Sequence, residues 1–323
     1  MTILVAGGAG YIGSHTVKGL VRSGFDVLIF DNFSSGKREF VGTTPCIEGD
    51  LLDKEAVAGA FRAAPISAVL HFASLIQVGE SYADPRKYYA HNLVTSLNLL
   101  DGMLQAGVKH LIFSSSAAVY GVPMETPIPE THPRNPANPY GQTKFMVERI
   151  LQDYDRAYGL KSISLRYFNA AGADPEGGLG ECHEPETHLV PNILLRALGR
   201  TARLGVFGND FPTPDGTAVR DYIHVTDLAA AHVSALQSLE AGGPGGLINL
   251  GTNKGYSVLE VIRAAEEVTG RKVPYEILPR RKGDVAVLLA SKEKAESALG
   301  WTPRLSGLDK IIATAWNWHK SRP

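Results

Sequence analysis

The sequence predicts an α/β protein with a doubly wound parallel sheet and a smaller α/β domain beside it. In the first half of the chain, short apolar runs typical of buried strands alternate with stretches of helical periodicity. Such strict alternation indicates parallel strands joined by crossover helices. After Asn169 the alternation stops, and a segment rich in glycine, proline and acid follows from Ala170 to Pro185. Such a segment indicates a loop or domain junction, with the smaller domain after it.

The expected elements follow from apolar periodicity. Six strands of the large sheet are expected at 2–6, 26–30, 45–50, 68–73, 110–114 and 162–167, with helices at 15–22, 54–63, 88–105 and 141–158. The helix at 88–105 carries Leu93, Leu97, Leu100 and Leu104 on one face. Later helices are expected at 192–198, 226–239, 258–269 and 308–319, and extended segments at 204–208 and 247–250. Trp316 and Trp318 are interpreted as packing residues of the last helix.

A glycine loop connects the first strand to the first helix. Gly7, Gly10 and Gly13 are spaced three apart, which differs from the commoner G-x-G-x-x-G pattern. Gly7 allows a sharp turn, Gly10 allows close approach of a phosphate, and Gly13 allows the helix to pack on the strand. The N–H groups of the helix start then face an anion. The loop therefore predicts a Rossmann-type dinucleotide site.

The second strand ends in Asp31, eighteen residues after Gly13. A carboxylate at this place accepts hydrogen bonds from a ribose 2′-hydroxyl and repels a 2′-phosphate, which favours NAD over NADP. Lys37 and Arg38 follow closely and are either solvated loop charges or contacts to such a phosphate.

Other candidate groups stand where the strands of the sheet end. Ligands of doubly wound sheets lie outside these carboxyl ends. The rule places Asp50, Phe72–Ser74 and Ser114–Ser116 along one crevice. Asp50 is interpreted either as a contact to the adenine amine or as a turn or cap residue, and His71 as a core residue.

Tyr140 and Lys144 are the candidate catalytic pair. On a helix, positions i and i+4 share a face. A tyrosine has a pKa near 10, so Lys144 and a positive nicotinamide are expected to lower it by about three units, or about 4 kcal/mol. The pair follows the fifth strand, whose Ser114–Ser116 end offers a hydroxyl to the same substrate oxygen. A base, a cation, a positioning hydroxyl and a hydride acceptor together predict a redox step.

Composition narrows the functional classes. Hydrophobic residues make up 44% and charged residues 20% of the 323 positions, and the formal net charge is −1. The chain has no large excess of charge that would attract nucleic acid or a lipid surface, so neither partner is expected. Cys46 and Cys182 show no metal-ligand spacing, and no metal site is predicted. No signal peptide or membrane span is recognised, and a cytoplasmic protein is expected.

These features resemble the extended short-chain dehydrogenase/reductase family. The resemblance covers nearly the whole chain and is carried by seven stretches: Gly7–His15, Phe113–Gly121, Pro139–Gly141, Leu165–Asn169, Phe207–Asp210, Val219–Val225 and Pro279–Asp284. It implies 4-epimerisation of UDP-galactose and UDP-glucose by transient oxidation at C4, with tightly bound NAD. A 4-epimerase acting on another UDP-sugar, such as UDP-N-acetylglucosamine, a UDP-pentose or UDP-glucuronate, is the alternative.

The resemblance also implies binding residues. Beyond the glycines, Ser114, Tyr140 and Lys144, it implies NAD contacts from Tyr11, Ile12, Asp31, Asp50, Leu51, Phe72, Ala73, Asn92, Ser116 and Phe168. For the UDP-sugar it implies Ser116, Asn169, His188, Phe207, Arg220, Arg281, Asp284 and, beside the sugar, Leu288. Catalysis is expected from Tyr140, Lys144 and Ser116.

Domain limits and assembly follow from the same resemblance. An NAD-binding domain is expected over 1–168 and about 219–251, and a nucleotide-sugar-binding domain over about 169–218 and 252–323. A homodimer is implied, with the two long helices in its interface. The chain departs from some relatives at Ile76 or Gln77, where a lysine stands, at His188, where an asparagine stands, and at Leu288, where a tyrosine or small residue stands.

Three other functions fit the sequence less well. A sugar-nucleotide dehydratase needs an acidic pair after the fifth strand, and Ser116–Ala118 offers none. An ordinary dehydrogenase would release its reduced cofactor. A non-catalytic NAD sensor would have no need of Tyr140 and Lys144, which are both present.

Overall fold

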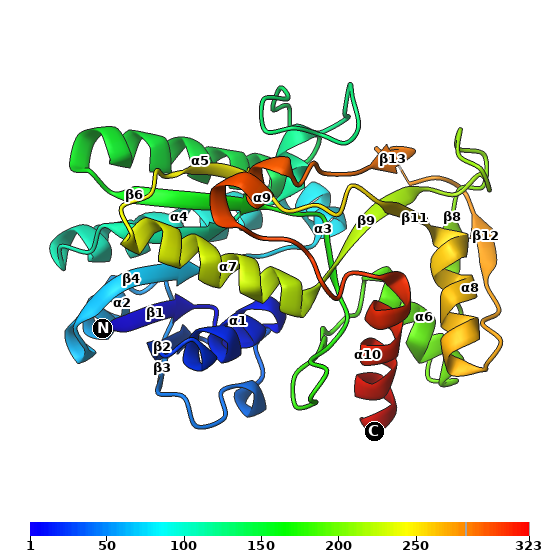
Figure 1. Ribbon diagram of the computed structural model, residues 1–323, viewed down its shortest axis with the longest axis horizontal. Coiled ribbons are helices and arrows are strands. Elements are labelled where there is room, and N and C mark those ends of the chain that lie inside the picture. Colours follow the sequence, from blue (N-terminus) through cyan, green and yellow to red (C-terminus); the bar gives the residue numbers. More distant parts are fainter. Residues whose placement is uncertain (282, 323) are drawn as a thin grey trace.

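A parallel sheet of seven strands forms the centre of the larger part of the molecule (Figure 1). The computed structural model describes residues 1–281 and 283–322. The strand order is β10–β6–β5–β4–β1–β2–β3. The strands are β1 (Thr2–Ala6), β2 (Asp26–Asp31), β3 (Cys46–Glu48), β4 (Ile66–His71), β5 (His110–Ser114), β6 (Lys161–Arg166) and β10 (Gly246–Asn249). The order reverses direction between β1 and β4, which confirms the predicted doubly wound sheet.

Helices cover both faces of this sheet (Figure 1). On one face, α1 (Tyr11–Arg22) and α7 (Val225–Glu240) pack their apolar residues against β1, β2 and β6. On the other face lie α2 (Lys54–Ala63), α4 (Pro85–Gln105) and α5 (Pro139–Tyr158). Because each face has its own apolar core, the strands are buried on both sides, as parallel sheets require. The chain also forms the short helices α3 (Val78–Ala83) and α9 (Glu293–Leu299) and the 3₁₀ turns η1 (Arg38–Phe40) and η2 (Ala117–Tyr120).

Several helices begin earlier than the periodicity predicts, and capping explains why. Asp84 accepts a hydrogen bond from the Lys87 N–H and starts α4 at Pro85, where the sequence predicted residue 88. Asn138 accepts from the Gly141 N–H, so α5 begins at Pro139 and includes Tyr140 in its first turn. Proline suits the first helical position because it has no N–H to lose. Apolar periodicity does not register such polar first turns.

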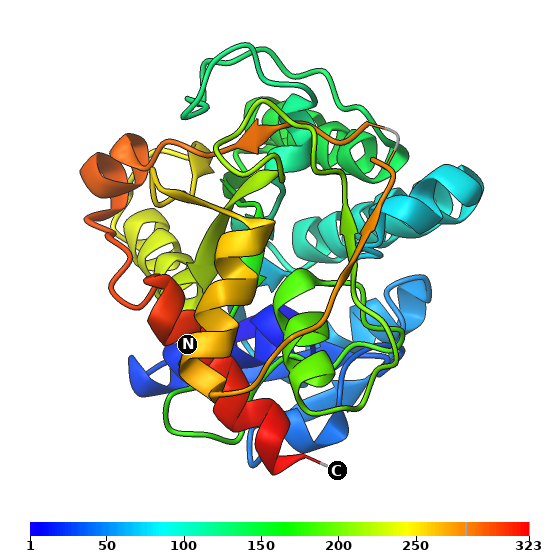
Figure 2. The same ribbon diagram turned by 90° about the vertical axis from the view of Figure 1, so that its right-hand side faces the viewer.

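The smaller part of the molecule contains two short sheets and three helices. In one sheet β9 (Val219–His224) pairs with β7 (Asn169–Ala171), β11 (Gly255–Ser257) and β13 (Val287–Leu288), and in the other β8 (Gly205–Phe207) pairs with β12 (Glu276–Leu278). Figure 2 shows α6 (Leu189–Ala197), α8 (Val258–Thr269) and α10 (Leu308–Ser321), which share one apolar core. Strand β9 was not predicted, because arginine, aspartate and histidine interrupt its apolar run. It belongs to the smaller sheet, whereas α7 and β10 return to the larger one.

The packing of individual apolar residues follows the prediction only in part. Trp316 and Trp318 are buried, as expected for packing residues. The leucine face of α4 is its core face only in part, because Leu100 is buried and Leu93 packs against the core, whereas Leu97 is 37% exposed. Among the described helices, none combines the length and apolarity that a membrane crossing requires.

Candidate active site

Of the three spaced glycines in the loop, only Gly10 has room for a Cβ. Gly7 has φ of +81°, and a Cβ there would lie 2.6 Å from the Ala73 nitrogen. A Cβ on Gly13 would lie 2.1 Å from the Gly7 oxygen. A Cβ on Gly10 would meet only that same oxygen, at 3.4 Å, which is ordinary contact. Packing within the protein therefore explains Gly7 and Gly13, whereas Gly10 keeps open the space at the first turn of α1, where a pyrophosphate fits.

Asp31 ends β2 directly beside this loop. Its buried carboxylate accepts hydrogen bonds from the Ala9 N–H at 2.9 Å and the Phe33 N–H at 2.9 Å. Burial raises the pKa of Asp31, and these two hydrogen bonds act in the opposite direction. A carboxylate has about four acceptor sites, so two remain for ribose hydroxyls. Lys37 and Arg38 form ion pairs with Glu184 and Glu48.

The neighbouring strand ends carry the other predicted cofactor residues. Asp50 accepts from the Leu52 N–H at 2.8 Å and from Asn32 Nδ2 at 3.0 Å, so it acts as a turn residue; an adenine contact stays a prediction. Phe72 follows β4 and packs on His232, with ring centroids 4.8 Å apart. The Tyr11 hydroxyl donates to the Gly172 oxygen at 2.6 Å and thereby joins α1 to the end of β7. Ile12 and Ala73 are half-buried and Leu51 is buried.

Asn92 connects the segment after β4 to α5. Its side chain accepts from the Leu75 N–H at 2.9 Å and donates to Thr143 Oγ1 at 3.1 Å. It therefore holds the backbone on which Ser74 lies. Of the two positions where some relatives carry lysine, Ile76 is 41% exposed and Gln77 precedes α3.

Tyr140 and Lys144 lie on one face of α5, as predicted. The Lys144 Nζ is 5.9 Å from the centre of the Tyr140 ring and donates to Ser74 Oγ at 2.7 Å and to the Ser114 carbonyl oxygen at 2.8 Å. Burial lowers the pKa of Lys144 to about 7, while the charge of Glu148 acts to raise it. Burial raises the pKa of Tyr140, and a hydrogen bond with Ser116 acts to lower it. The expected lowering of the tyrosine pKa by Lys144 together with a positive nicotinamide stays a prediction, because these protein side chains act without the cofactor.

The serines after β5 have different partners. Ser116 Oγ accepts from the Ala118 N–H at 3.1 Å and faces Tyr140. Ser114 Oγ is 2.5 Å from the Tyr167 hydroxyl, so its carbonyl, rather than its hydroxyl, faces Lys144. Phe168 packs beside η2 with Leu288. Leu288 therefore lies close to the catalytic segment, as the predicted sugar contact requires.

A group of predicted substrate residues gathers on the smaller part of the molecule. The Arg220 and Arg281 guanidinium groups lie 4.0 and 3.2 Å from the Asp284 carboxylate. The Arg281 guanidinium also stacks over the Phe207 ring, 4.7 Å from its centre. Strand register pairs Arg220 with Leu288, which joins this group to the sugar side. Lys282, within the last stretch of the resemblance, lies outside the described residues.

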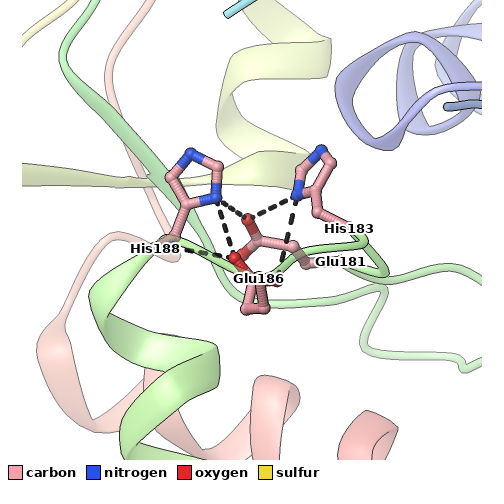
Figure 3. A group of neighbouring side chains, drawn as sticks. All are labelled: Glu181, His183, Glu186 and His188. Carbon is pink, nitrogen blue, oxygen red and sulfur yellow. Dashed lines mark hydrogen bonds and ion pairs between the residues drawn. The ribbon is translucent and has the colours of Figure 1, made fainter. Parts of the chain in front are cut away.

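Asn169 and His188 contact residues other than these arginines. Asn169 Nδ2 donates to the Asp221 carbonyl oxygen at 2.8 Å. His188 precedes α6, and its Nδ1 is 2.7 Å from Glu181 and 3.1 Å from Glu186 (Figure 3). Burial acts to lower the pKa of His188, but the two carboxylates outweigh it and raise that pKa to about 10. The binding roles of both residues stay predictions.

Sequence reasoning missed a buried network directly behind Lys144. Glu148 and Arg166 form a two-pronged ion pair with no exposed side-chain surface. Ser115 Oγ donates to Glu148 at 2.6 Å, and Arg166 donates to the Tyr120 hydroxyl at 2.7 Å. The pair joins α5 to β6, so it fixes the helix that carries Tyr140 and Lys144. Its partners are 18 residues apart, and no local sequence pattern links them.

Comparison with known proteins agrees with this geometry. Residues 3–251 match the NAD dependent epimerase/dehydratase family. The chain is 49% identical over 324 residues to UDP-glucose 4-epimerase of Lacticaseibacillus casei, a match that covers 100% of this chain and 98% of that protein.

Two solved structures are similar along their whole length. UDP-glucose 4-epimerase from Brucella ovis in complex with NAD has a TM-score of 0.96 and 46% identity, covering 98% of this chain and 97% of that one. The Bifidobacterium longum enzyme in complex with NAD⁺ and UDP has a TM-score of 0.95 and 42% identity, covering 100% and 99%. The chain therefore belongs to the NAD dependent epimerase/dehydratase family.

Proposed function

We propose that the protein interconverts UDP-galactose and UDP-glucose by transient oxidation at C4 of the sugar. The observation that carries this proposal is the position of Tyr140 and Lys144, with Ser116 facing the phenol at the strand end beside the glycine loop. The curated relatives named UDP-glucose 4-epimerase support it. So do the related structures in complex with NAD and with NAD⁺ and UDP.

Proton transfer is assigned to Tyr140. Its phenolate removes the proton from the sugar 4-hydroxyl, while Ser116 holds the same oxygen by a hydrogen bond. Bound NAD supplies reversible hydride acceptance at C4 and a positive charge beside the phenol. Lys144, held by Ser74 and the Ser114 carbonyl, adds a second positive charge nearby. Two cations in a dry cleft can provide the roughly 4 kcal/mol that a three-unit pKa shift needs.

Substrate binding is assigned to the smaller part of the molecule. Planar guanidinium forks such as those of Arg220 and Arg281 bind phosphate oxygens in pairs. Phe207 packs under Arg281 and limits its orientations. Leu288 offers the sugar an apolar wall without hydrogen bonds, so the keto sugar is free to present either face to the hydride. Net oxidation over one turnover is zero.

The cofactor is assigned as NAD. Asp31 retains acceptor sites for a ribose diol and repels a 2′-phosphate. Lys37 and Arg38 are the two nearby cations that could have bound the 2′-phosphate of NADP. Both have carboxylate partners instead, Lys37 with Glu184 and Arg38 with Glu48. We also assign cofactor binding to 1–168 with 225–251 and UDP-sugar binding to 169–224 with 252–322, because β9 pairs in the smaller sheet.

A homodimer through α4 and α5 completes the proposal. These helices lie side by side along one face of the molecule (Figure 1) and expose Val94 (40%), Leu97 (37%) and Met146 (37%). Between them is a groove of about 340 Å³ lined by Leu93, Phe145, Met146, Arg149 and Ile150.

A cytoplasmic location agrees with two half-buried cysteines that form no disulfide.

One assay tests the proposal. The purified protein is incubated with UDP-galactose without added cofactor, and the epimers are resolved by chromatography. UDP-glucose should accumulate to equilibrium, and denaturing the protein should release about one NAD per chain. Dependence on added cofactor that is consumed, or release of NADP, would contradict the proposal. Sedimentation at micromolar concentration tests the dimer separately.

A further inference from the structure

Two histidines and two glutamates form a compact group between β7 and α6. Glu181, His183, Glu186 and His188 come from one eight-residue segment, and one ligand atom from each lies within 4.8 Å of the others (Figure 3). Both imidazole rings point their Nδ1 atoms at the carboxylates. The proposed reaction needs at most His188 from this group, so the arrangement of the other three has no assigned purpose.

The distances suit donor atoms around a common centre. His188 Nδ1 is 2.7 Å from Glu181 Oε1 and 3.1 Å from Glu186 Oε1. His183 Nδ1 is 3.1 Å from Glu181 Oε1 and 3.9 Å from Glu186 Oε2. Donors about 2.0–2.2 Å from a tetrahedral zinc ion lie about 3.3–3.6 Å from one another. Three of the observed separations are shorter than that range and one is longer, so the donors would shift by a few tenths of an ångström to hold an ion.

The group brings two buried carboxylates together. The Glu181 side chain is 4% exposed and that of Glu186 is 10% exposed. Within residues 1–281 and 283–322, neither carboxylate has a lysine or arginine in ion-pair contact. Without an ion, protonated His188, whose pKa the two carboxylates raise to about 10, is their counter-charge. A divalent cation would take its place and balance both carboxylates, because a metal binds the deprotonated imidazole.

We propose that Glu181, His183, Glu186 and His188 bind one divalent transition-metal ion, with Zn²⁺ as the best match. Two imidazole nitrogens and two carboxylate oxygens form a borderline donor set that Zn²⁺ accepts in four-coordinate geometry. No metal was predicted from the sequence, because its two cysteines lack metal-ligand spacing. The spacing Glu-x-His-x-x-Glu-x-His was the signal available in the sequence.

The surroundings already hold the donors in position. Trp318 Nε1 donates to the Glu181 carbonyl at 2.8 Å, and Gly180 packs so tightly that a Cβ would lie 2.4 Å from the Trp318 ring. Glu186 Oε1 accepts the N–H groups of Thr187 and His188, each at 2.8 Å. Preformed donors of this kind reduce the ordering cost of metal binding.

An ion at this place would fix the segment between the glycine loop and the smaller part of the molecule. The His183 ring lies edge-on to Tyr11 at 6.2 Å, and His188 starts α6. Because both histidines bind through Nδ1, the Nε2 of His188 stays available for a substrate group. The ion is therefore structural, and the proposal does not depend on the identity of the reaction.

Metal content of the full-length protein tests the proposal. The protein is equilibrated with Zn²⁺, desalted, and measured by inductively coupled plasma mass spectrometry. About one zinc per chain is expected in the parent, falling at least fivefold in His183→Gln and in Glu186→Gln. His110→Gln, changed outside the group at the start of β5, is the control and should keep one zinc. A parent without bound zinc, or variants that retain it, would overturn the proposal.

Cobalt substitution gives a readout that needs no variant. Co²⁺ bound to the parent protein should show the strong visible absorption of four-coordinate cobalt, and added Zn²⁺ should remove it. Only the weak absorption of six-coordinate aqueous cobalt would overturn the assignment. Normal epimerase activity with no bound metal would refute this inference alone, whereas one zinc per chain without activity would refute the proposed reaction alone.

Discussion

Tyr140 illustrates how a single side chain depends on its neighbours for chemistry. The protein side chains act on its pKa in opposite directions, burial raising it and Ser116 lowering it. Lys144 is fixed by Ser74 and the Ser114 carbonyl, so it contributes position and charge without contacting the phenol directly. We infer that the tyrosine becomes an effective base only in the complex with cofactor.

Replacing Tyr140 with phenylalanine tests this assignment. Tyr140→Phe keeps the ring and removes the hydroxyl, so the fold and the bound NAD should be preserved. General acid–base groups contribute about 10²- to 10⁴-fold to a rate, and kcat should fall within that range. The measurement is kcat for UDP-galactose together with the NAD content of the purified variant. Activity within tenfold of the parent would exclude Tyr140 as the base.

Leu288 is the residue at which substrate width can be tested. It packs with Phe168 beside η2 and pairs with Arg220 in the sheet register. An apolar contact of this size discriminates by about 1–3 kcal/mol, or tenfold to a few hundredfold. We therefore expect weak turnover of the N-acetylated UDP-sugars beside the main pair.

Leu288→Tyr should suppress this side activity and spare the main one, because the larger ring crowds a 2-acetamido group. The measurement is kcat/KM for UDP-galactose and for UDP-N-acetylgalactosamine in parent and variant. Leu289→Tyr, at the adjoining half-buried position, serves as the matched control. An unchanged ratio in Leu288→Tyr would show that this side chain does not line the sugar pocket.

At the scale of elements, α5 is positioned by the buried ion pair of Glu148 and Arg166. The pair spans from the helix to β6, and Ser115 and Tyr120 complete its hydrogen bonds. Removing one member of such a pair leaves an unpaired buried charge, which costs about 3–5 kcal/mol. Removing both members costs less, because no charge remains buried.

A double-mutant cycle checks this network. Arg166→Met should lower the free energy of unfolding by about 3–5 kcal/mol, and Glu148→Gln combined with Arg166→Met should lower it by less than the sum of the single changes. Urea unfolding with NAD in excess gives the four values. Additive effects would show that the two side chains do not act as a pair.

The elements that sequence reasoning found were those with an apolar period. The strands Thr2–Ala6 and His110–Ser114 and the helices Lys54–Ala63 and Val258–Thr269 match their predicted limits. Strand β9 was missed because its inward and outward positions mix apolar and charged residues. Its partners lie in three separate parts of the chain, so only the folded chain shows why it is a strand.

Site residues divide in the same way. The glycine loop, Asp31 and the Tyr140–Lys144 spacing are local patterns, and sequence alone indicated them. The partners of Lys144, which are Ser74 and the Ser114 carbonyl, come from other strands. Glu148 with Arg166 is likewise a product of tertiary packing. The Glu181–His188 group is local in sequence, but its shared centre becomes visible only when the loop is folded.

At the scale of the whole molecule, folding buries several histidines in the neutral form. Burial lowers the pKa of His15, His224 and His232 to about 4 and that of His71 to about 3. An unfolded chain protonates these rings near pH 6.5. The stabilisation is therefore fully present above pH 6.5 and is lost as the pH falls from there towards 4, because the unfolded state then binds more protons.

His232→Asn isolates one of these contributions. His232 Nδ1 lies 2.8 Å from the Leu228 carbonyl oxygen, and an asparagine amide can donate to the same oxygen without titrating. Each such histidine contributes up to about 1.4 kcal/mol per pH unit to the slope of stability against pH. The free energy of unfolding is measured with urea at pH 7.5 and pH 5, with NAD in excess.

The variant should lose about 1–2 kcal/mol less than the parent across this interval. All other titrating groups, including Glu181, His183, Glu186 and His188, are common to both proteins and cancel in the comparison. Equal losses in parent and variant would show that His232 takes up its proton in the folded state as readily as in the unfolded one.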